Sequence, residues 1–197
     1  MRDKQSTPGV ASIAFMSTLL GGCTSLAVMS HVPVSTMVRL ASLKLAEIVP
    51  SELRVAARLP EALEPRRDGV KVRLDVSGSS PAARRSADIV LEPAIEPGEL
   101  ARLSAHMRAG FRIWVYRLSA PDVERLKRFI AEAGGGSGVS IATGVDACHR
   151  KPLGEGRLLT TTFLRTHATD YFILTEELDL RSVVSERDLA ARVPPCG

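Results

Sequence analysis

Five residues in the C-terminal half of the chain could do chemistry if the fold gathered them. Asp146, Cys148 and His149 are nearly consecutive, and His167 and Asp170 follow. Thiolate, imidazole and carboxylate groups bind zinc or copper, and a thiolate near a histidine can act as a nucleophile. The spacing is weak support, because neighbours on an extended chain point to opposite faces. We therefore predict no metal site, with Cys148, His149 and His167 as weak candidates.

Several common catalytic motifs are missing from the chain. It has no G-x-S-x-G elbow, no H-E-x-x-H pair and no G-x-x-x-x-G-K loop, which serve acyl transfer, zinc binding and phosphate binding. The glycine run at residues 134–138 lacks a lysine and follows a predicted helix, so we interpret it as a linker. We predict a non-catalytic protein without a cofactor. An enzyme that uses the region of Cys148, His149 and His167 is the alternative.

The start of the chain has the pattern of an export signal. A short charged stretch precedes an apolar run over residues 10–20, and Leu20-Gly21-Gly22-Cys23 ends it. As a helix this run would be about 16 Å long, too short for the ~30 Å core of a bilayer. The pattern resembles the lipobox of bacterial lipoproteins, in which signal peptidase II cuts before a lipid-modified cysteine. An N-terminal core helix ended by the two glycines is the alternative.

The resemblance implies that residues 1–22 form a cleaved signal peptide and that Cys23 carries a diacylglycerol and an amide-linked acyl chain such as palmitate. Several acyl chains hold a protein firmly, because each buried methylene contributes about 0.8 kcal/mol. Cys23 is followed by Thr24 rather than aspartate, which favours the outer membrane, facing the periplasm, over the inner membrane. We expect residues 23–50 to form the anchored segment and residues 51–197 a single globular β-rich domain.

Assignment of Cys23 to lipid leaves a pair among the three cysteines, Cys148 and Cys196. The compartment outside the inner membrane is oxidising, so this pair can form a disulfide. Such a bond would fasten the C-terminal tail, which otherwise frays, and would contribute about 4 kcal/mol in the chain-entropy account. Two unrelated thiols are the alternative.

The charge of the chain is only slightly positive. The formal net charge is +4, and loss of the leader lowers it by one, so we expect no nucleic-acid partner. The basic pairs Arg66-Arg67 and Arg84-Arg85 lie in turn-like segments. They are either solvated or in contact with anionic lipid or an envelope polymer.

Alternating apolar and charged residues mark several strands. Residues 53–59 and 70–76 alternate strictly, with one face buried and one face wet, and we expect them to pair across a turn-rich loop. Residues 87–92 suit an edge strand. Residues 111–118 carry large apolar groups on both faces, which suits a central strand covered on both sides. Further strand candidates are residues 139–145, 157–165 and 171–175.

The clearest helix spans residues 119–133, because Ser119 and Asp122 form a capping arrangement and apolar residues recur at helical spacing. Weaker helices are predicted at residues 36–46, 97–108 and 185–191. Strands dominate, so we predict a mainly β fold, an antiparallel β-sandwich with helical insertions. An α+β fold, with a helix layer on an antiparallel sheet, is the alternative.

These features favour a lipid-anchored envelope protein that acts as a binding or structural module with an envelope protein as its partner. Fold class supports this only by association, since many functions share one fold. The alternatives are an envelope enzyme and a carrier of lipid or another apolar ligand, whose groove the apolar segment after Cys23 would help to line.

Overall fold

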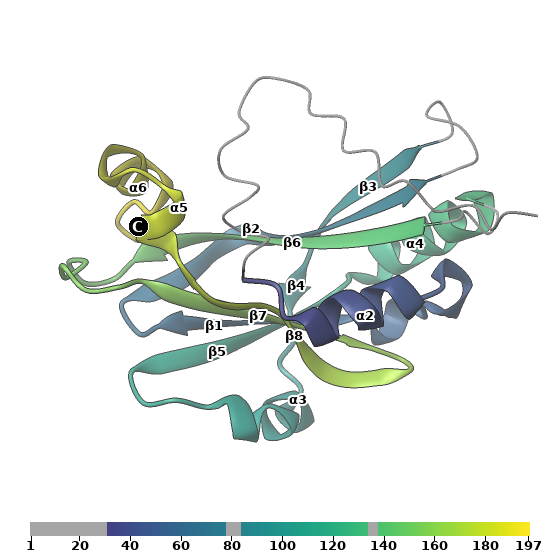
Figure 1. The fold of residues 1–197 in the computed structure, drawn as a ribbon, viewed down its shortest axis with the longest axis horizontal. Helices are drawn as coiled ribbons and strands as arrows, with labels where there is room; N and C mark the ends of the chain where they lie inside the picture. Colours follow the sequence, from purple (N-terminus) through teal and green to yellow (C-terminus); the bar gives the residue numbers. More distant parts are fainter. Residues whose placement is uncertain (1–30, 78–83, 134–137) are drawn as a thin grey trace, which may run out of the picture.

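The computed structural model describes residues 31–77, 84–133 and 138–197. Two antiparallel sheets pack face to face in these residues (Figure 1). The prediction of a mainly β fold, an antiparallel β-sandwich with helical insertions, is confirmed.

The larger sheet has five strands in the order β4-β5-β1-β7-β8, and the smaller has three in the order β3-β2-β6. The strands of the larger sheet are β1 (Arg54–Pro60), β4 (Glu92–Pro93), β5 (Phe111–Arg117), β7 (Leu159–Thr166) and β8 (Thr169–Asp179). Those of the smaller sheet are β2 (Leu63–Ser77), β3 (Arg85–Val90) and β6 (Gly138–His149). The predicted edge strand is β3, which lies at an edge.

Strands β1 and β2 follow each other in sequence but lie in different sheets. β1 pairs with β5 and β7, whereas β2 pairs with β3 and β6. The predicted pairing of residues 53–59 with 70–76 is therefore wrong. Alternation shows which face of a strand is buried but not which strand lies beside it.

The main core lies between the two sheets, and in β2 and β8 it takes alternate residues of the strand. Its buried strand residues are Val55, Val70, Val72, Leu74, Val76, Ile89, Tyr116, Ile141, Leu164, Phe172 and Leu174. Burial of each large side chain contributes about 1.5–3 kcal/mol. Leu45 and Ile48, which precede the strands, are buried in the same core.

The helices lie at the flanks and ends of the sandwich. They are α2 (Val34–Ser42), α3 (Pro97–Arg102), α4 (Ala120–Ala133), α5 (Leu180–Val183) and α6 (Glu186–Arg192), with short 3-10 turns η1 (Leu45–Glu47), η2 (Pro50–Glu52) and η4 (Ser104–His106). The predicted cap of α4 is confirmed, because the hydroxyl of Ser119 accepts the N–H of Asp122 at 3.3 Å. The helix predicted over residues 97–108 is α3 followed by η4.

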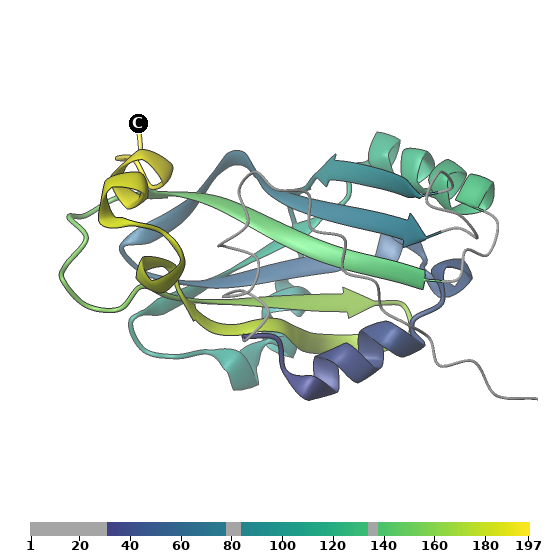
Figure 2. The same ribbon diagram turned by 45° about the horizontal axis from the view of Figure 1, so that its top comes forward.

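Two helices cover opposite flanks of the sandwich (Figure 2). α2 contacts β6 and β8, whereas α4 contacts β3, η1 and η2. Leu126 of α4 is completely buried against the core. A groove opens between the first part of β2 and residues 113–116 of β5. None of the described helices is long and apolar enough to cross a membrane.

Candidate functional site: a groove on one flank of the sandwich

A groove of about 750 Å³ opens between the two sheets on the flank that carries β4 and β5. One wall is formed by residues 64–68 of β2 and the other by residues 113–116 of β5. Residues 91–97 and Leu100 of α3 enclose one end. We call this the flank groove. Its volume lies in the range of about 300–1,000 Å³ that is usual for ligand sites.

The β5 wall of the flank groove is an open strand edge. β4 lies opposite only Tyr116 and Arg117, and the N–H of Ala94 then donates to the carbonyl of Val115 at 2.8 Å. Ile113 lies two residues before Val115, and backbone groups two residues apart on a strand point to the same side. The N–H and C=O of Ile113 therefore point away from β1, toward the side on which Ala94 lies. Among the described residues, no strand lies beside them on this side.

Both faces of β5 are covered, as predicted, although much of its outer edge is open. Trp114 and Tyr116 pack toward the main core, and Ile113 and Val115 pack with Leu103 on the outer face of the larger sheet. We expected β5 to be a central strand, paired on both sides, and this is true only of its last residues, which lie between β1 and β4. Apolar groups on both faces of a strand report what lies above and below it, not what lies beside it.

The opposite wall is the irregular first part of β2, which the sequence analysis predicted to be a turn-rich loop. Pairing with β6 shifts register between Pro65 and Val70, so this part is a bulged strand. Asp68 has a φ of 58°, and a Cβ on Gly69 would lie 2.6 Å from a backbone oxygen of β6. Aspartate tolerates a left-handed backbone and glycine a close approach, so the Asp-Gly pair permits the bulge.

The bulge places two arginines at the rim of the flank groove. Arg66 and Arg67 are exposed, and within the described ranges neither forms an ion pair. Arg112 is exposed on β5, with its guanidinium 5.4 Å from the ring centre of Trp114. This end of the groove therefore carries the guanidinium groups of Arg66 and Arg67 and the exposed carboxylate of Asp68, and Arg112 lies next to it.

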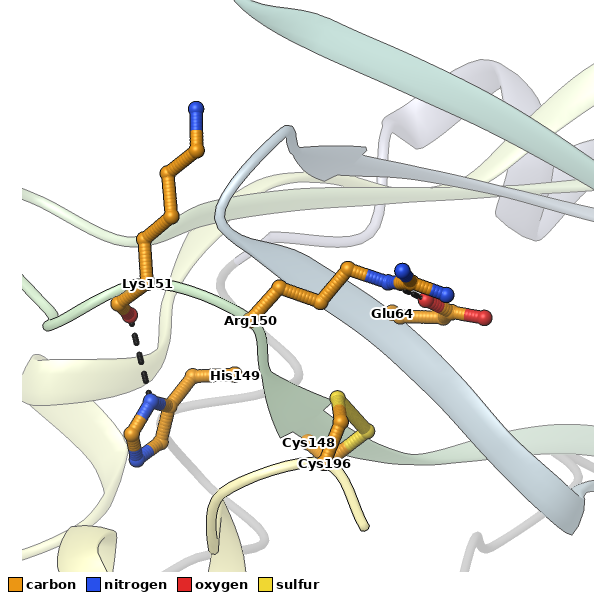
Figure 3. Close-up of a disulfide and its surroundings, with 6 residues drawn as sticks. All are labelled: Glu64, Cys148, His149, Arg150, Lys151 and Cys196. Atoms are coloured by element: carbon orange, nitrogen blue, oxygen red, sulfur yellow. Dashed lines mark hydrogen bonds and ion pairs between the residues drawn. A yellow bond between two sulfur atoms is a disulfide. The ribbon is translucent and has the colours of Figure 1, made fainter.

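Glu64 does not neutralise these arginines because it is already paired. Its carboxylate accepts a hydrogen bond from Arg150 (Figure 3). This bond and the positive charges of Arg150 and Arg112 lower the pKa of Glu64 below its ordinary value of 4.5. Glu64 is thus ionised at neutral pH and balanced by Arg150.

The other end of the flank groove has a surplus of negative charge. Glu92 and Glu96 share the guanidinium of Arg117, at 3.0 Å and 2.8 Å. The Oε2 atom of Glu96 is buried and has no hydrogen-bond partner in the part of the chain that the structure describes. The groove is therefore positive at the bulge and negative near β4.

Apolar side chains line the groove between its charged ends. Ile95 is 88% exposed and Leu100 is 42% exposed, which is unusual for large aliphatic residues. The indole Nε1 of Trp114 is buried without a partner among the described residues. Burial raises the pKa of Tyr116 to about 12, so its phenol stays neutral. The groove thus offers apolar contact, and its walls contain two buried polar atoms, Glu96 Oε2 and Trp114 Nε1, without a hydrogen-bond partner among the described residues.

A buried ion cluster holds α3, and with it Leu100, against the larger sheet. Glu99 of α3 accepts hydrogen bonds from Arg165 at 2.8 Å and from the hydroxyl of Tyr171 at 2.7 Å. Arg54 lies 3.6 Å from the same carboxylate. The three charged side chains are only 10–14% exposed. This cluster fixes one boundary of the flank groove rather than forming a reactive centre.

The predicted disulfide between Cys148 and Cys196 is present (Figure 3). The N–H of His149 donates to the carbonyl of Pro194 at 2.9 Å, and the N–H of Cys196 donates to the carbonyl of His149 at 3.0 Å. The C-terminal tail is therefore fastened by a covalent bond and a short parallel bridge. The disulfide leaves Cys148 without a thiolate for catalysis or metal binding.

The two candidate histidines have separate surroundings. His149 is the last residue of β6, opposite Leu63 of β2, and its Nδ1 lies 3.1 Å from the carbonyl of Lys151 (Figure 3). His167 lies in the turn between β7 and β8, with Nδ1 3.1 Å from the carboxylate of Glu52. Both rings thus have local partners of their own.

The remaining two candidates pair with basic side chains at the surface. Asp146 accepts a hydrogen bond from Lys71 at 3.2 Å, and Asp170 lies 3.8 Å from Arg102. Among the described residues, no group of three or more histidine, cysteine, aspartate or glutamate side chains could hold a metal ion. The structure does not bring the five candidates of the sequence analysis together.

The leader, Cys23 and Thr24 lie outside the described residues, so the lipobox stays a prediction. The described chain begins at His31, whose carbonyl accepts the N–H of Glu176 in β8 at 2.7 Å. β8 and the β4–β5 side are opposite edges of the larger sheet. The chain therefore enters the sandwich on the side away from the flank groove.

The flank groove is not predicted by the sequence pattern. Arg66-Arg67 were expected in a turn, and the Asp-Gly pair that follows them is the one signal for a bulge. Ile95 stands between Pro93 and Pro97, and both prolines interrupt regular pairing. Nothing in the pattern indicated that these segments lie on the same flank as β5.

Comparison with known proteins adds no assignment. No protein-family model, no curated protein and no solved structure matches the chain. Function must therefore be inferred from the site itself.

Proposed function

We propose that the protein is a lipid-anchored, non-catalytic binding protein of the cell envelope that holds another envelope protein in its flank groove. The observation that carries this proposal is the open edge of β5 at Ile113, beside the exposed side chains of Ile95 and Leu100. Open strand edges and exposed apolar groups promote aggregation, and proteins usually cover both. A surface that combines an open strand edge with exposed apolar side chains is suited to binding a protein partner.

The position of the groove supports attachment through the N-terminus. Seven residues separate Cys23 from His31, and even fully extended they would span only about 27 Å. His31 lies at the β8 edge, so lipid on Cys23 would keep that edge near the membrane. The flank groove, at the opposite edge, would then face the periplasm.

The side of the sandwich near this connection also exposes apolar groups. Val34, Met37 and Val38 of α2 are 44–72% exposed and lie at the spacing of one helix face. Apolar groups of this kind suit the boundary between headgroups and acyl chains. The disulfide is equally suited to an exported protein. Thr24 favours the outer membrane, with the inner membrane as the alternative.

The anchor is tested with the Cys23→Ala variant. The wild-type protein should fractionate with membranes and have an intact mass equal to residues 23–197 plus lipid. The variant should stay an uncleaved precursor without lipid. Normal processing and membrane association of Cys23→Ala would refute the anchor.

The binding surface is tested with a matched pair of variants. Ile95→Glu adds a charge inside the flank groove, whereas Met107→Glu adds one at another exposed apolar residue, 62% exposed, outside it. Cross-linking in cells followed by mass spectrometry should show a partner adduct that Ile95→Glu removes and Met107→Glu keeps. Equal adducts from both variants would contradict the proposal. A lipid that copurifies in the groove would instead favour the carrier.

A further inference from the structure

We propose that the flank groove takes an extended polypeptide segment that adds to β5 as a further strand, with an acidic side chain beside the arginines of the bulge. The inference rests on the proposed function and specifies the chemistry of the partner. Addition of a strand to an open sheet edge is a general way to bind peptides, since backbone hydrogen bonds supply affinity and alternate side chains supply specificity.

The backbone of β5 offers the required bonds. Ala94 already occupies the position of a neighbouring strand at Val115. An incoming segment would continue along the same edge past Ile113 toward Phe111, where the N–H of Phe111 is already bonded to Arg108. Each bond formed to the Ile113 N–H or C=O would contribute by removing an unpaired group from a half-buried site.

The walls of the groove favour a single segment. Residues 64–68 form the wall opposite the open edge, and residues 91–97 close one end of the groove. One extended chain fits beside the open edge, because an added strand lies about 4.8 Å from its neighbour. In a second copy of the protein, the same residues beside its own β5 edge would collide with these walls before the two edges could pair.

The charge pattern selects the side chains of the segment. Arg66 and Arg67 form no ion pair among the described residues, and with Arg112 nearby they outnumber the one exposed carboxylate at this end, Asp68. The other end carries Glu92 and Glu96 around one arginine. A segment with an acidic residue at the bulge and apolar residues next to it complements both ends. A uniformly anionic polymer would match one end and be repelled at the other.

The test uses the full mature protein in detergent micelles and a defined peptide, acetyl-Thr-Asp-Val-Thr-Val-Thr-Val-amide. The single tryptophan of the chain, Trp114, lines the groove, so its fluorescence reports occupancy directly. We expect a saturable change in fluorescence and at least tenfold slower amide hydrogen exchange at Ile113. A peptide with lysine in place of aspartate should bind at least fivefold more weakly.

Two N-methylated peptides test strand addition itself. One carries N-methyl groups at the odd positions and the other at the even positions. Only one side of an added strand faces β5, so one peptide should lose at least tenfold in affinity and the other should bind like the parent. Equal binding of both would overturn strand addition while leaving the groove as a binding site.

Protein variants test the charge. Arg66→Glu with Arg67→Glu should weaken the acidic peptide about tenfold and strengthen the lysine peptide. The matched control, Arg128→Glu with Arg187→Glu, changes two exposed arginines on α4 and α6 and should leave both affinities unchanged. An equal loss in both pairs of variants would overturn the role of the bulge.

Three outcomes distinguish a failure of this inference from a failure of the proposed function on which it rests. No response of Trp114 to either peptide, with an Ile95-dependent adduct still present in cells, overturns the inference alone. Loss of both the peptide response and the adduct overturns the proposed function as well. Protection of Ile113 that depends on protein concentration without peptide would identify a second copy as the occupant and overturn the inference.

Discussion

The N–H of Ala94 donates to the carbonyl of Val115 at 2.8 Å, and the pairing along the outer edge of β5 stops there. The chain then passes through Ile95 and enters α3 at Pro97. Because it turns away at this point, the edge at Ile113 is left open and the side chain of Ile95 is left exposed. The flank groove is thus a direct result of how short β4 is.

The disulfide should stabilise the fold substantially. Replacement of both Cys148 and Cys196 by serine should lower the free energy of unfolding by about 2–4 kcal/mol, because the unfolded chain regains the freedom of a long loop. Urea denaturation measures this, and reduced wild-type protein should match the variant. Free thiols at these positions, counted in denaturant without reductant, would contradict the bond.

The Glu99 cluster should be sensitive to loss of its carboxylate. Glu99→Ala leaves the largely buried guanidinium groups of Arg54 and Arg165 without their partner, so we expect a loss of about 3–5 kcal/mol in unfolding free energy. Glu132→Ala removes an exposed ion pair with Arg85 and should cost under about 1 kcal/mol. Similar losses from both variants would show that the cluster contributes no more than a surface pair.

Asp179 should support stability only when ionised. Burial by itself raises its pKa, but hydrogen bonds from the N–H groups of Leu158 and Arg181, together with Arg157, hold the pKa below its ordinary value of 3.8. Its contribution is therefore complete above that value and is lost as pH falls through the lower, folded-state pKa. Asp179→Asn should cost about 0.5–2 kcal/mol at pH 7, and the difference should shrink toward pH 2. A difference independent of pH would contradict this role.

The two tyrosines should resist ionisation in the folded protein. Burial raises the pKa of Tyr116 to about 12. Burial and the hydrogen bond to Glu99 raise the pKa of Tyr171 further. The unfolded state ionises first, near pH 10, so stability should fall as pH rises from 10 toward 12. Absorbance at 295 nm should show little phenolate in folded protein at pH 10.5, and a half-complete titration at pH 10 would contradict the burial.

Alternation of apolar and charged residues predicts the buried face of a strand well where only one face of that strand is covered. In β2, Val70, Val72, Leu74 and Val76 are all at most 2% exposed, as their spacing indicates. The same rule is wrong for β1, whose Arg58 was expected on a wet face. Its side chain is 13% exposed, because η4 and an ion pair cover the outer face of the larger sheet. Charge alone does not reveal such cover.

The candidate site could not be predicted from the sequence, because the sequence pattern of a strand does not show what lies beside it. The disulfide followed from counting cysteines once Cys23 was assigned to lipid, which needs no knowledge of strand order. The flank groove depends on β5 being paired on one side only and on a bulge opposite it. Neither property changes the apolar pattern of Trp114 or Ile113, so only the three-dimensional arrangement reveals it.

The most direct test of the account is photo-cross-linking in living cells from a single position. A photoreactive amino acid at Ile95, inside the flank groove, should give one discrete protein adduct, with the cross-link in an extended segment of the partner that contains an acidic residue. The same amino acid at Met107 should give no such adduct. Equal labelling from the two positions, or none from Ile95, would contradict the claim that the flank groove is the binding surface.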